Sequence, residues 1–218
     1  MAAPRNIQAE QGVIDAFRDY YRKFSEFKGS TGQSFSVGAR DKLIAGDYIF
    51  VSDSYFTLIE FKWDEDGFKK ERAKSIAKLL CPALNTPGNE PMRKLAKKCH
   101  RIAWNNGLKV ELGTYLDVVC CGGSQGIQAK DFCSQWFTPP PPHRASYDDF
   151  QKYIKWILSL SSSSQSELLL IGGNHIQEEG ELPDLFLGQF YGIEELKEWL
   201  DENEPPQPTS SYGTQFTP

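Results

Sequence analysis

The chain has 218 residues, of which 39% are hydrophobic and 13% aromatic, and its formal net charge is −5. This composition is that of a globular protein with one sizeable core, and it excludes a wholly disordered chain. No stretch approaches the roughly eighteen consecutive apolar residues of a membrane helix, and the first residues lack a signal-peptide core. We therefore expect a cytoplasmic protein with no membrane partner.

Five cysteines are an odd number, and no CxxC pair occurs among them. This predicts buried, reduced thiols rather than a disulfide framework. Zinc held by Cys99-His100, Cys120-Cys121 and Cys133 is the alternative. It is disfavoured because adjacent cysteines on a strand project to opposite sides and the paired spacing of zinc ligands is missing.

Residues 7–27 are predicted to form a helix with one apolar stripe. The stripe consists of Val13, Phe17, Tyr20, Phe24 and Phe27. Glu10 lies on the same stripe, three residues before Val13. A carboxylate on a face that packs against the core needs a compensating role. The alternative is an ordinary first-turn acid favoured by the helix dipole.

Residues 34–37 are predicted to form an edge strand, and residues 46–62 a β-hairpin that turns at Asp53-Ser54. Alternation along a strand places Glu60 and Lys62 on one face. With a two-residue turn, Asp47 lies opposite Glu60 on that face, whereas a three-residue turn would move it to the other face.

The predicted neighbours Asp47 and Glu60 are both carboxylates, and their repulsion favours a bound cation or a raised pKa. Hard oxygen ligands from Asp47, Glu60 and the backbone carbonyl of Phe61 suit Mg²⁺, with Mn²⁺ as a substitute. Asp41 competes with Asp47 for this role, but it lies further from the turn.

An Asp that begins one strand, followed by Glu60-x-Lys62 at the end of the next, resembles the PD-(D/E)XK, or restriction-endonuclease-like, nuclease superfamily. The family pattern often has Pro before the Asp, where this chain has Gly46. The resemblance implies a restriction-endonuclease-like α/β core with a mixed central sheet flanked by helices. It also implies that Asp47, Glu60 and Lys62 are catalytic and that Glu10, on the first helix, joins them. The alternative is a surface hairpin with an exposed Glu60-Lys62 ion pair.

A basic segment follows the Glu-x-Lys motif and contains ten of the 24 lysines and arginines between residues 69 and 101. Such a segment favours contact with a phosphate backbone, although a solvated helix face is an equal alternative. The residues closest to the motif are the predicted nucleic-acid contacts: Lys69, Lys70, Arg72 and Lys74. His100 is a further candidate for phosphate contact, and the alternative is that it has a structural role.

The rest of the chain is predicted from local patterns. We expect helices over residues 68–84, 91–99, 147–160 (capped by Ser146) and 193–200, and strands over 100–104, 114–121 and 167–171. The prolines at 139–142 mark a boundary. Residues 1–138 would form the nuclease-like core, residues 139–202 a C-terminal α/β extension packed on it as one domain, and residues 203–218 a disordered tail.

These observations predict a Mg²⁺-dependent nuclease that hydrolyses phosphodiester bonds in nucleic acid, with DNA as the favoured substrate. Two cuts on a duplex would call for a homodimer. A first alternative is an inactive nuclease-like module that docks to protein partners, with the acidic C-terminal region as the contact. A second is an acidic interaction protein of unrelated α/β fold.

Overall fold

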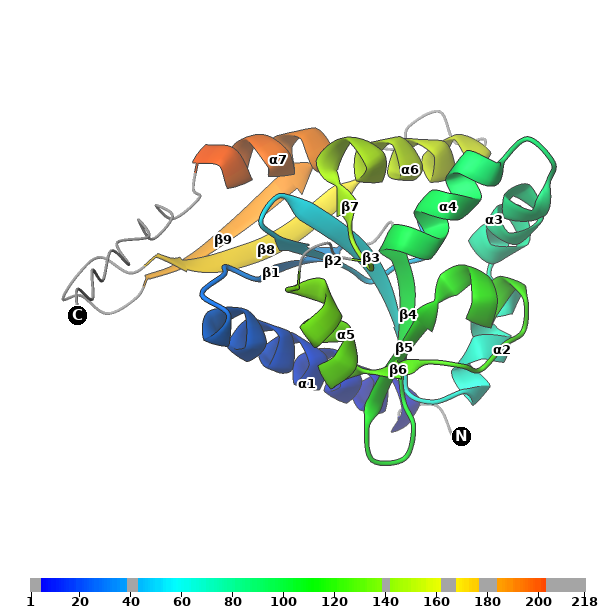
Figure 1. The fold of residues 1–218 in the computed structure, drawn as a ribbon, viewed down its shortest axis with the longest axis horizontal. Helices are drawn as coiled ribbons and strands as arrows, with labels where there is room; N and C mark the ends of the chain where they lie inside the picture. Colours follow the sequence, from blue (N-terminus) through cyan, green and yellow to red (C-terminus); the bar gives the residue numbers. More distant parts are fainter. Residues whose placement is uncertain (1–4, 39–42, 139–141, 162–167, 177–183, 203–218) are drawn as a thin grey trace, which may run out of the picture.

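A mixed β-sheet forms the centre of the computed structural model, which describes residues 5–38, 43–138, 142–161, 168–176 and 184–202. Within these residues the sheet has nine strands, and eight of them follow the order β6-β5-β4-β3-β2-β1-β8-β9, while β7 pairs with β3. Among the strands of the described residues, only β3 and β4 pair in parallel. The α/β class with a mixed sheet flanked by helices is therefore confirmed (Figure 1).

The strands are β1 (Gln33–Val37), β2 (Tyr48–Ser52), β3 (Tyr55–Lys62), β4 (His100–Asn105), β5 (Val110–Thr114), β6 (Ile127–Gln128), β7 (Ala145–Ser146), β8 (Leu169–Ile176) and β9 (Asp184–Tyr191). The helices are α1 (Arg5–Phe27), α2 (Asp66–Ala73), α3 (Ser75–Asn85), α4 (Glu90–Cys99), the π-helix η2 (Leu116–Cys120), α5 (Ala129–Trp136), α6 (Tyr147–Leu160) and α7 (Ile193–Glu202). None of these helices is long and apolar enough to cross a membrane.

Two apolar clusters cover the two faces of the sheet. On one face, α1 and α5 pack on side chains such as Phe50, Ile59 and Phe61. On the other, a larger cluster joins Leu58 and Ile102 to α2, α3, α4, α6 and α7. Because side chains alternate along β3, Glu60 and Lys62 share the face of Leu58 and lie on the side of α2 and α3.

The predicted hairpin register is confirmed. Ser52 pairs with Tyr55, and Asp53 and Ser54 form the two-residue turn. Both turn residues have positive φ, 49° and 62°, as in the primed turns that match the twist of a hairpin. The same register, continued beyond Tyr48 opposite Ile59, sets Asp47 across from Glu60.

Several predictions about the helices and strands were wrong, because tertiary packing overrides the local sequence pattern. The buried stripe of α1 includes Tyr21 rather than Tyr20, and Phe27 is 82% exposed. The 34–37 strand is not an edge strand, because β1 pairs with both β2 and β8. β8 continues past Gly172-Gly173 and pairs with β9, which the sequence did not indicate, and α5 was also missed.

The predicted strand at 114–121 is wrong over most of its length. The chain leaves β5 at Thr114 and forms η2, although the residues are β-branched and apolar. Thr114 explains the change, because its Oγ1 accepts a hydrogen bond from the Asp117 amide at 3.0 Å and donates one to the Asp117 carboxylate at 2.6 Å. This reciprocal capping initiates a helical turn.

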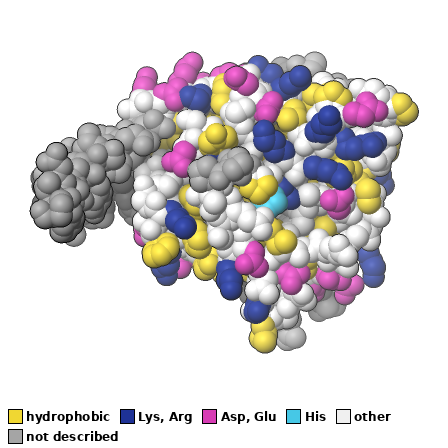
Figure 2. Space-filling view, in the orientation of Figure 1, with side chains coloured by type: hydrophobic (Ala, Val, Ile, Leu, Met, Phe, Trp, Pro, Cys, Tyr) yellow, Lys and Arg dark blue, Asp and Glu magenta, His cyan; other side chains and the backbone are white. Residues whose placement is uncertain are grey.

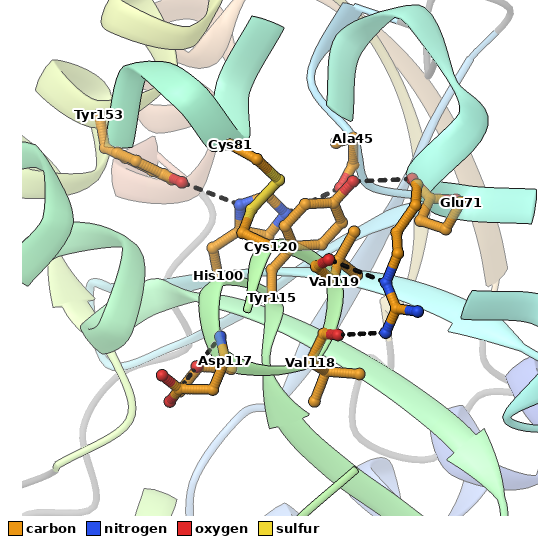
Figure 3. Close-up of a disulfide and its surroundings, with 12 residues drawn as sticks. Ala45, Glu71, Cys81, His100, Tyr115, Asp117, Val118, Val119, Cys120 and Tyr153 are labelled. Atoms are coloured by element: carbon orange, nitrogen blue, oxygen red, sulfur yellow. Dashed lines mark hydrogen bonds between the residues drawn. A yellow bond between two sulfur atoms is a disulfide. The ribbon is translucent and has the colours of Figure 1, made fainter. Parts of the chain in front are cut away.

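The expectation of reduced thiols is also wrong for two of the five cysteines. Cys81 on α3 and Cys120 on η2 form a disulfide across 39 residues of sequence, with their Cα atoms 5.0 Å apart (Figure 3). Sequence spacing could not reveal it, because the packing of α3 against η2 brings the two residues together. Cys99 and Cys133 are buried free thiols, and Cys121 is an exposed one.

The elements after the proline run extend the same sheet through β7, β8 and β9. The predicted helices at 147–160 and 193–200 are confirmed as α6 and α7, and Ser146 caps α6 by accepting a hydrogen bond from the Asp149 amide. Asp41, residues 139–141 and the expected tail at 203–218 lie outside the described residues.

Candidate active site

A cavity of about 540 Å³ opens at the carboxyl end of β3. It brings together three residues predicted to be catalytic, Glu10 from α1, Asp47 before β2 and Lys62 at the end of β3. Glu60 lies beneath them and is fully buried. The other lining residues come from the turn after β3 and from the start of α2 to the α2-α3 junction: Trp63, Asp64, Asp66, Gly67, Lys70 and Lys74.

Asp47 is held by backbone contacts with β3. Its amide donates to the Ile59 carbonyl at 3.0 Å, and its Oδ2 accepts from the Phe61 amide at 2.7 Å. Burial raises the pKa of Asp47 well above its usual value, and the nearby Glu60 carboxylate raises it further. The side chain is therefore a partly buried carboxyl group whose ionised form would be favoured by an added positive charge.

Gly46 stands where the resembled family often has Pro, and the structure gives a reason for glycine. A Cβ atom at this position would lie 2.4 Å from the Leu58 side chain. Only glycine lets the chain approach β3 closely enough to place Asp47. The preceding Ala45 has a φ of 55°, a conformation that costs about 1 to 2 kcal/mol for an L-residue with a side chain.

His100 supports this strained turn from β4. Its Nε2 lies 2.8 Å from the Ala45 carbonyl oxygen, which can only accept, so Nε2 carries the proton. Its Nδ1 then accepts from the Tyr153 hydroxyl at 2.9 Å (Figure 3). The ring is fully buried and stacks on Tyr115. The idea that His100 contacts phosphate was therefore wrong.

Glu60 receives two ammonium groups on one oxygen. Its Oε1 accepts from Lys62 Nζ and from Lys74 Nζ, the latter at 2.7 Å. Burial alone would raise the pKa of Glu60, but the charges of Lys62 and Lys74 bring it down to about 2. Glu60 is therefore ionised at neutral pH, and its buried Oε2 has no hydrogen-bond partner among the described residues.

Lys62 Nζ lies at the centre of the acidic groups. It donates to the Phe61 carbonyl at 2.7 Å and lies 3.4 Å from carboxylate oxygens of both Glu10 and Glu71. Burial would lower the pKa of Lys62, but the surrounding carboxylates raise it above its usual value, so the side chain stays charged. The surface ion pair considered as the alternative is thus excluded, because Glu60 and Lys62 are both buried.

Glu71 and Lys74 also belong to the site. The sequence did not lead us to Glu71, and it predicted Lys74 as a phosphate contact only. The predicted 68–84 helix breaks at Lys74, which is extended with a ψ of 146°. At this break, Lys74 Nζ lies 2.7 Å from carboxylate oxygens of both Glu60 and Glu71. Lys74 is thereby an internal partner of the acids as well as a lining residue.

Glu71 is fully buried and accepts a hydrogen bond from the Tyr115 hydroxyl at 2.9 Å. Burial raises the pKa of Glu71 to about 7, and repulsion by Glu60 contributes. A signal was present in the sequence: Glu71 follows Phe68 by three residues and so lies on the apolar side of its helix, as Glu10 does on α1.

The other predicted phosphate contacts differ in whether their charged groups face the solvent. Lys69 and Lys70 are exposed on α2. Arg72 donates to the carbonyls of Val118 and Val119, so its guanidinium anchors η2 and is not presented to a ligand. Figure 2 shows further Lys and Arg side chains gathered over α4, whose sequence contains Arg93, Lys94, Lys97 and Lys98.

The site offers oxygen donors of the kind that a hard divalent cation takes. The carboxyl groups of Glu10, Asp47, Glu60 and Glu71 lie around the ammonium groups of Lys62 and Lys74. Glu60 Oε1 and the Phe61 carbonyl already converge on a cation, the Lys62 ammonium. Mg²⁺ needs only one or two carboxylates and keeps its waters. Among the described residues, no three His, Cys, Asp or Glu side chains are grouped so as to hold a metal ion, and this applies to the predicted zinc ligands and to these carboxylates alike. A cation held by Asp47 and Glu60 would therefore take its other ligands from the Phe61 carbonyl and from water.

Comparisons of the chain with family models, with curated proteins and with solved structures found no match.

Lys74 is predicted to stabilise the fold through the two buried acids. Replacing Lys74 with Met should lower the free energy of unfolding by about 2 kcal/mol, because Glu60 loses a charged hydrogen-bond partner and Glu71 loses an ion-pair partner. Lys69→Met is the matched control, since Lys69 is exposed and pairs with the exposed Asp66, and its removal should change stability by less than about 0.5 kcal/mol. Urea unfolding measures both. Equal effects would show that the Lys74 contacts do not contribute.

His100 is predicted to make the protein sensitive to acid. Burial lowers its pKa from 6.5 to about 4. As the pH falls below 6.5, His100 therefore takes up a proton in the unfolded chain but not in the native state. The stability that neutral His100 contributes is complete above pH 6.5 and is lost as the pH approaches 4. Wild type should lose roughly 3 kcal/mol relative to His100→Gln over this range. Urea unfolding at several pH values tests this, and a stability difference independent of pH would contradict it.

Proposed function

We propose that the protein is a Mg²⁺-dependent nuclease of the PD-(D/E)XK, or restriction-endonuclease-like, superfamily that hydrolyses phosphodiester bonds in DNA. One observation carries the proposal: Glu10, Asp47 and Lys62, from three segments of the chain, line one cavity, and the buried Glu60 is paired with Lys62. The order of elements supports it, since a helix, a hairpin and further helices lead to a strand parallel to the one that carries Glu60 and Lys62.

Asp47, Glu60 and the Phe61 carbonyl would hold the metal. When bound, Mg²⁺ lowers the pKa of a coordinated water and offsets charge on the scissile phosphate. Glu10 is 35% exposed at the cavity and is suited to contact the metal's waters. Mn²⁺ should substitute, because it accepts the same oxygen ligands.

Lys62 is assigned the role of orienting the attacking water and countering phosphate charge. A group that is already protonated cannot accept a proton, and the carboxylates around Lys62 keep its pKa above the usual value. Lys74 shares Glu60 Oε1 with Lys62 and so keeps that carboxylate in place when Lys62 moves toward a substrate. Lys70, which lines the cavity, and Lys69, exposed on the same helix, would contact phosphates.

The proposal predicts metal-dependent cleavage that depends on two buried residues. Purified protein should cut linear, nicked, branched or single-stranded DNA with Mg²⁺ or Mn²⁺ and not with EDTA. Glu60→Gln and Lys62→Met, which keep side-chain shape, should each reduce the rate by at least about 100-fold. Lys155→Ala, an exposed residue of α6 paired with Glu194, is the control and should cut like wild type.

Circular dichroism and thermal unfolding establish that each variant is folded before its rate is compared. Full activity in Lys62→Met, or cleavage that survives EDTA, would contradict the proposed site. A folded wild type that cuts neither DNA nor RNA and binds no divalent metal would instead support the inactive module that docks to protein partners.

A further inference from the structure

Trp63 follows Lys62 directly and lies on the wall of the same cavity. It is 40% exposed, which is unusual for a residue whose large apolar surface normally favours burial. No other aromatic residue lines the cavity within the described part of the chain. An exposed aromatic side chain thus stands beside the groups that would act on a phosphate.

The other four tryptophans have ring partners, and Trp63 differs from them. Trp104 contacts Phe68, Trp136 contacts Tyr21, Trp156 stacks on Tyr153, and Trp199 contacts Phe35 and Phe190. Among the described residues, no aromatic or cation-π contact is made by the Trp63 ring. Together with its 40% exposure, this leaves part of the Trp63 side chain available to a ligand.

The backbone around Trp63 is fixed on both sides. The Trp63 carbonyl accepts from the Asn105 amide at 3.1 Å, which ties it to the end of β4. The next residue, Asp64, accepts from the Gly67 amide through its carbonyl at 3.1 Å and its Oδ1 at 3.2 Å. A side chain on such a turn is pre-organised, which reduces the entropy lost on binding.

We propose that Trp63 is a stacking platform for an unpaired nucleobase next to the scissile phosphate, so that the substrate is single-stranded or carries an extruded base at the cut. This inference rests on the proposed nuclease function. Every base has a π-face that can stack on an aromatic ring, but in an intact duplex these faces are covered by neighbouring base pairs. A cavity of about 540 Å³ is within the range that accepts a small organic ligand.

Binding without metal tests the inference separately from catalysis. Labelled single-stranded DNA and a blunt duplex of the same sequence are titrated with protein in EDTA at low salt, with anisotropy and tryptophan fluorescence as readouts. Trp63→Ala should weaken single-strand binding by about 5-fold to 150-fold, the usual contribution of one stacked base, and duplex binding by less than about 2-fold. Trp63→Phe should retain part of the affinity, because a smaller ring remains.

Tyr191→Ala is the matched control. Tyr191 is 57% exposed at the end of β9, at the far edge of the sheet from β6, and its removal should leave both affinities unchanged. Wild-type fluorescence should be quenched by the single strand, and Trp63→Phe should lose that quenching. Replacing bases one at a time with abasic sites should reveal one position whose loss weakens wild type but not Trp63→Ala.

Equal single-strand binding by Trp63→Ala and wild type, or an equal loss on both substrates, would overturn the stacking role. If wild type nevertheless cuts duplex DNA in a metal-dependent way, the nuclease proposal stands and only the stacking platform falls. If wild type binds single strands through Trp63 but cuts nothing, the platform stands and the nuclease proposal falls.

Discussion

The buried carboxylate of Glu60 is the constraint on which this end of the structure depends. A fully buried carboxylate is expensive unless ammonium groups or hydrogen bonds compensate it, and removing one partner of such a pair leaves an uncompensated charge. Glu60 obtains its partners from two places, Lys62 two residues away on β3 and Lys74 at the break between α2 and α3. Glu60 Oε1 therefore links the end of β3, which carries Lys62, to the α2-α3 break, which carries Lys74, at the base of the cavity.

Aromatic residues behind the cavity set the positions of these groups. Tyr115 donates to Glu71 and stacks on His100, and His100 in turn holds the Ala45 carbonyl two residues before Asp47. The Cys81-Cys120 disulfide and the Arg72 hydrogen bonds hold η2, the short helix that follows Tyr115, against α2 and α3 (Figure 3). The pKa values of Asp47 and Glu71 are both raised, and a bound divalent cation would favour the ionised forms of these two acids.

Local sequence rules predicted the centre of the site well. The turn at Asp53-Ser54 and the alternation along β3 decide which side chains face which way, and both depend on residues close in sequence. The apolar helical stripe singled out Glu10 as a carboxylate on the face that packs against the core, and the family resemblance led us to expect it beside Lys62, where it lies. The disulfide and the Tyr115-Glu71 hydrogen bond were not predictable in this way, because they join residues 39 and 44 positions apart in the chain. The helix break at Lys74 accompanies its pairing with Glu60, 14 residues earlier on β3. The π-helix after Thr114 had a local signal, the Thr114-Asp117 spacing, which was not used in the prediction.

The central claim is that Asp47 and Glu60 hold a divalent metal beside the Phe61 carbonyl. Crystals of the protein grown with Mn²⁺ and measured at a wavelength that gives its anomalous signal would test this directly. The account predicts an anomalous peak between the Asp47 and Glu60 carboxylates within about 2.2 Å of their oxygens, and no peak there in Asp47→Asn crystals. Well-ordered carboxylates with no peak between them at saturating Mn²⁺, and the Lys62 ammonium still on Glu60, would contradict it.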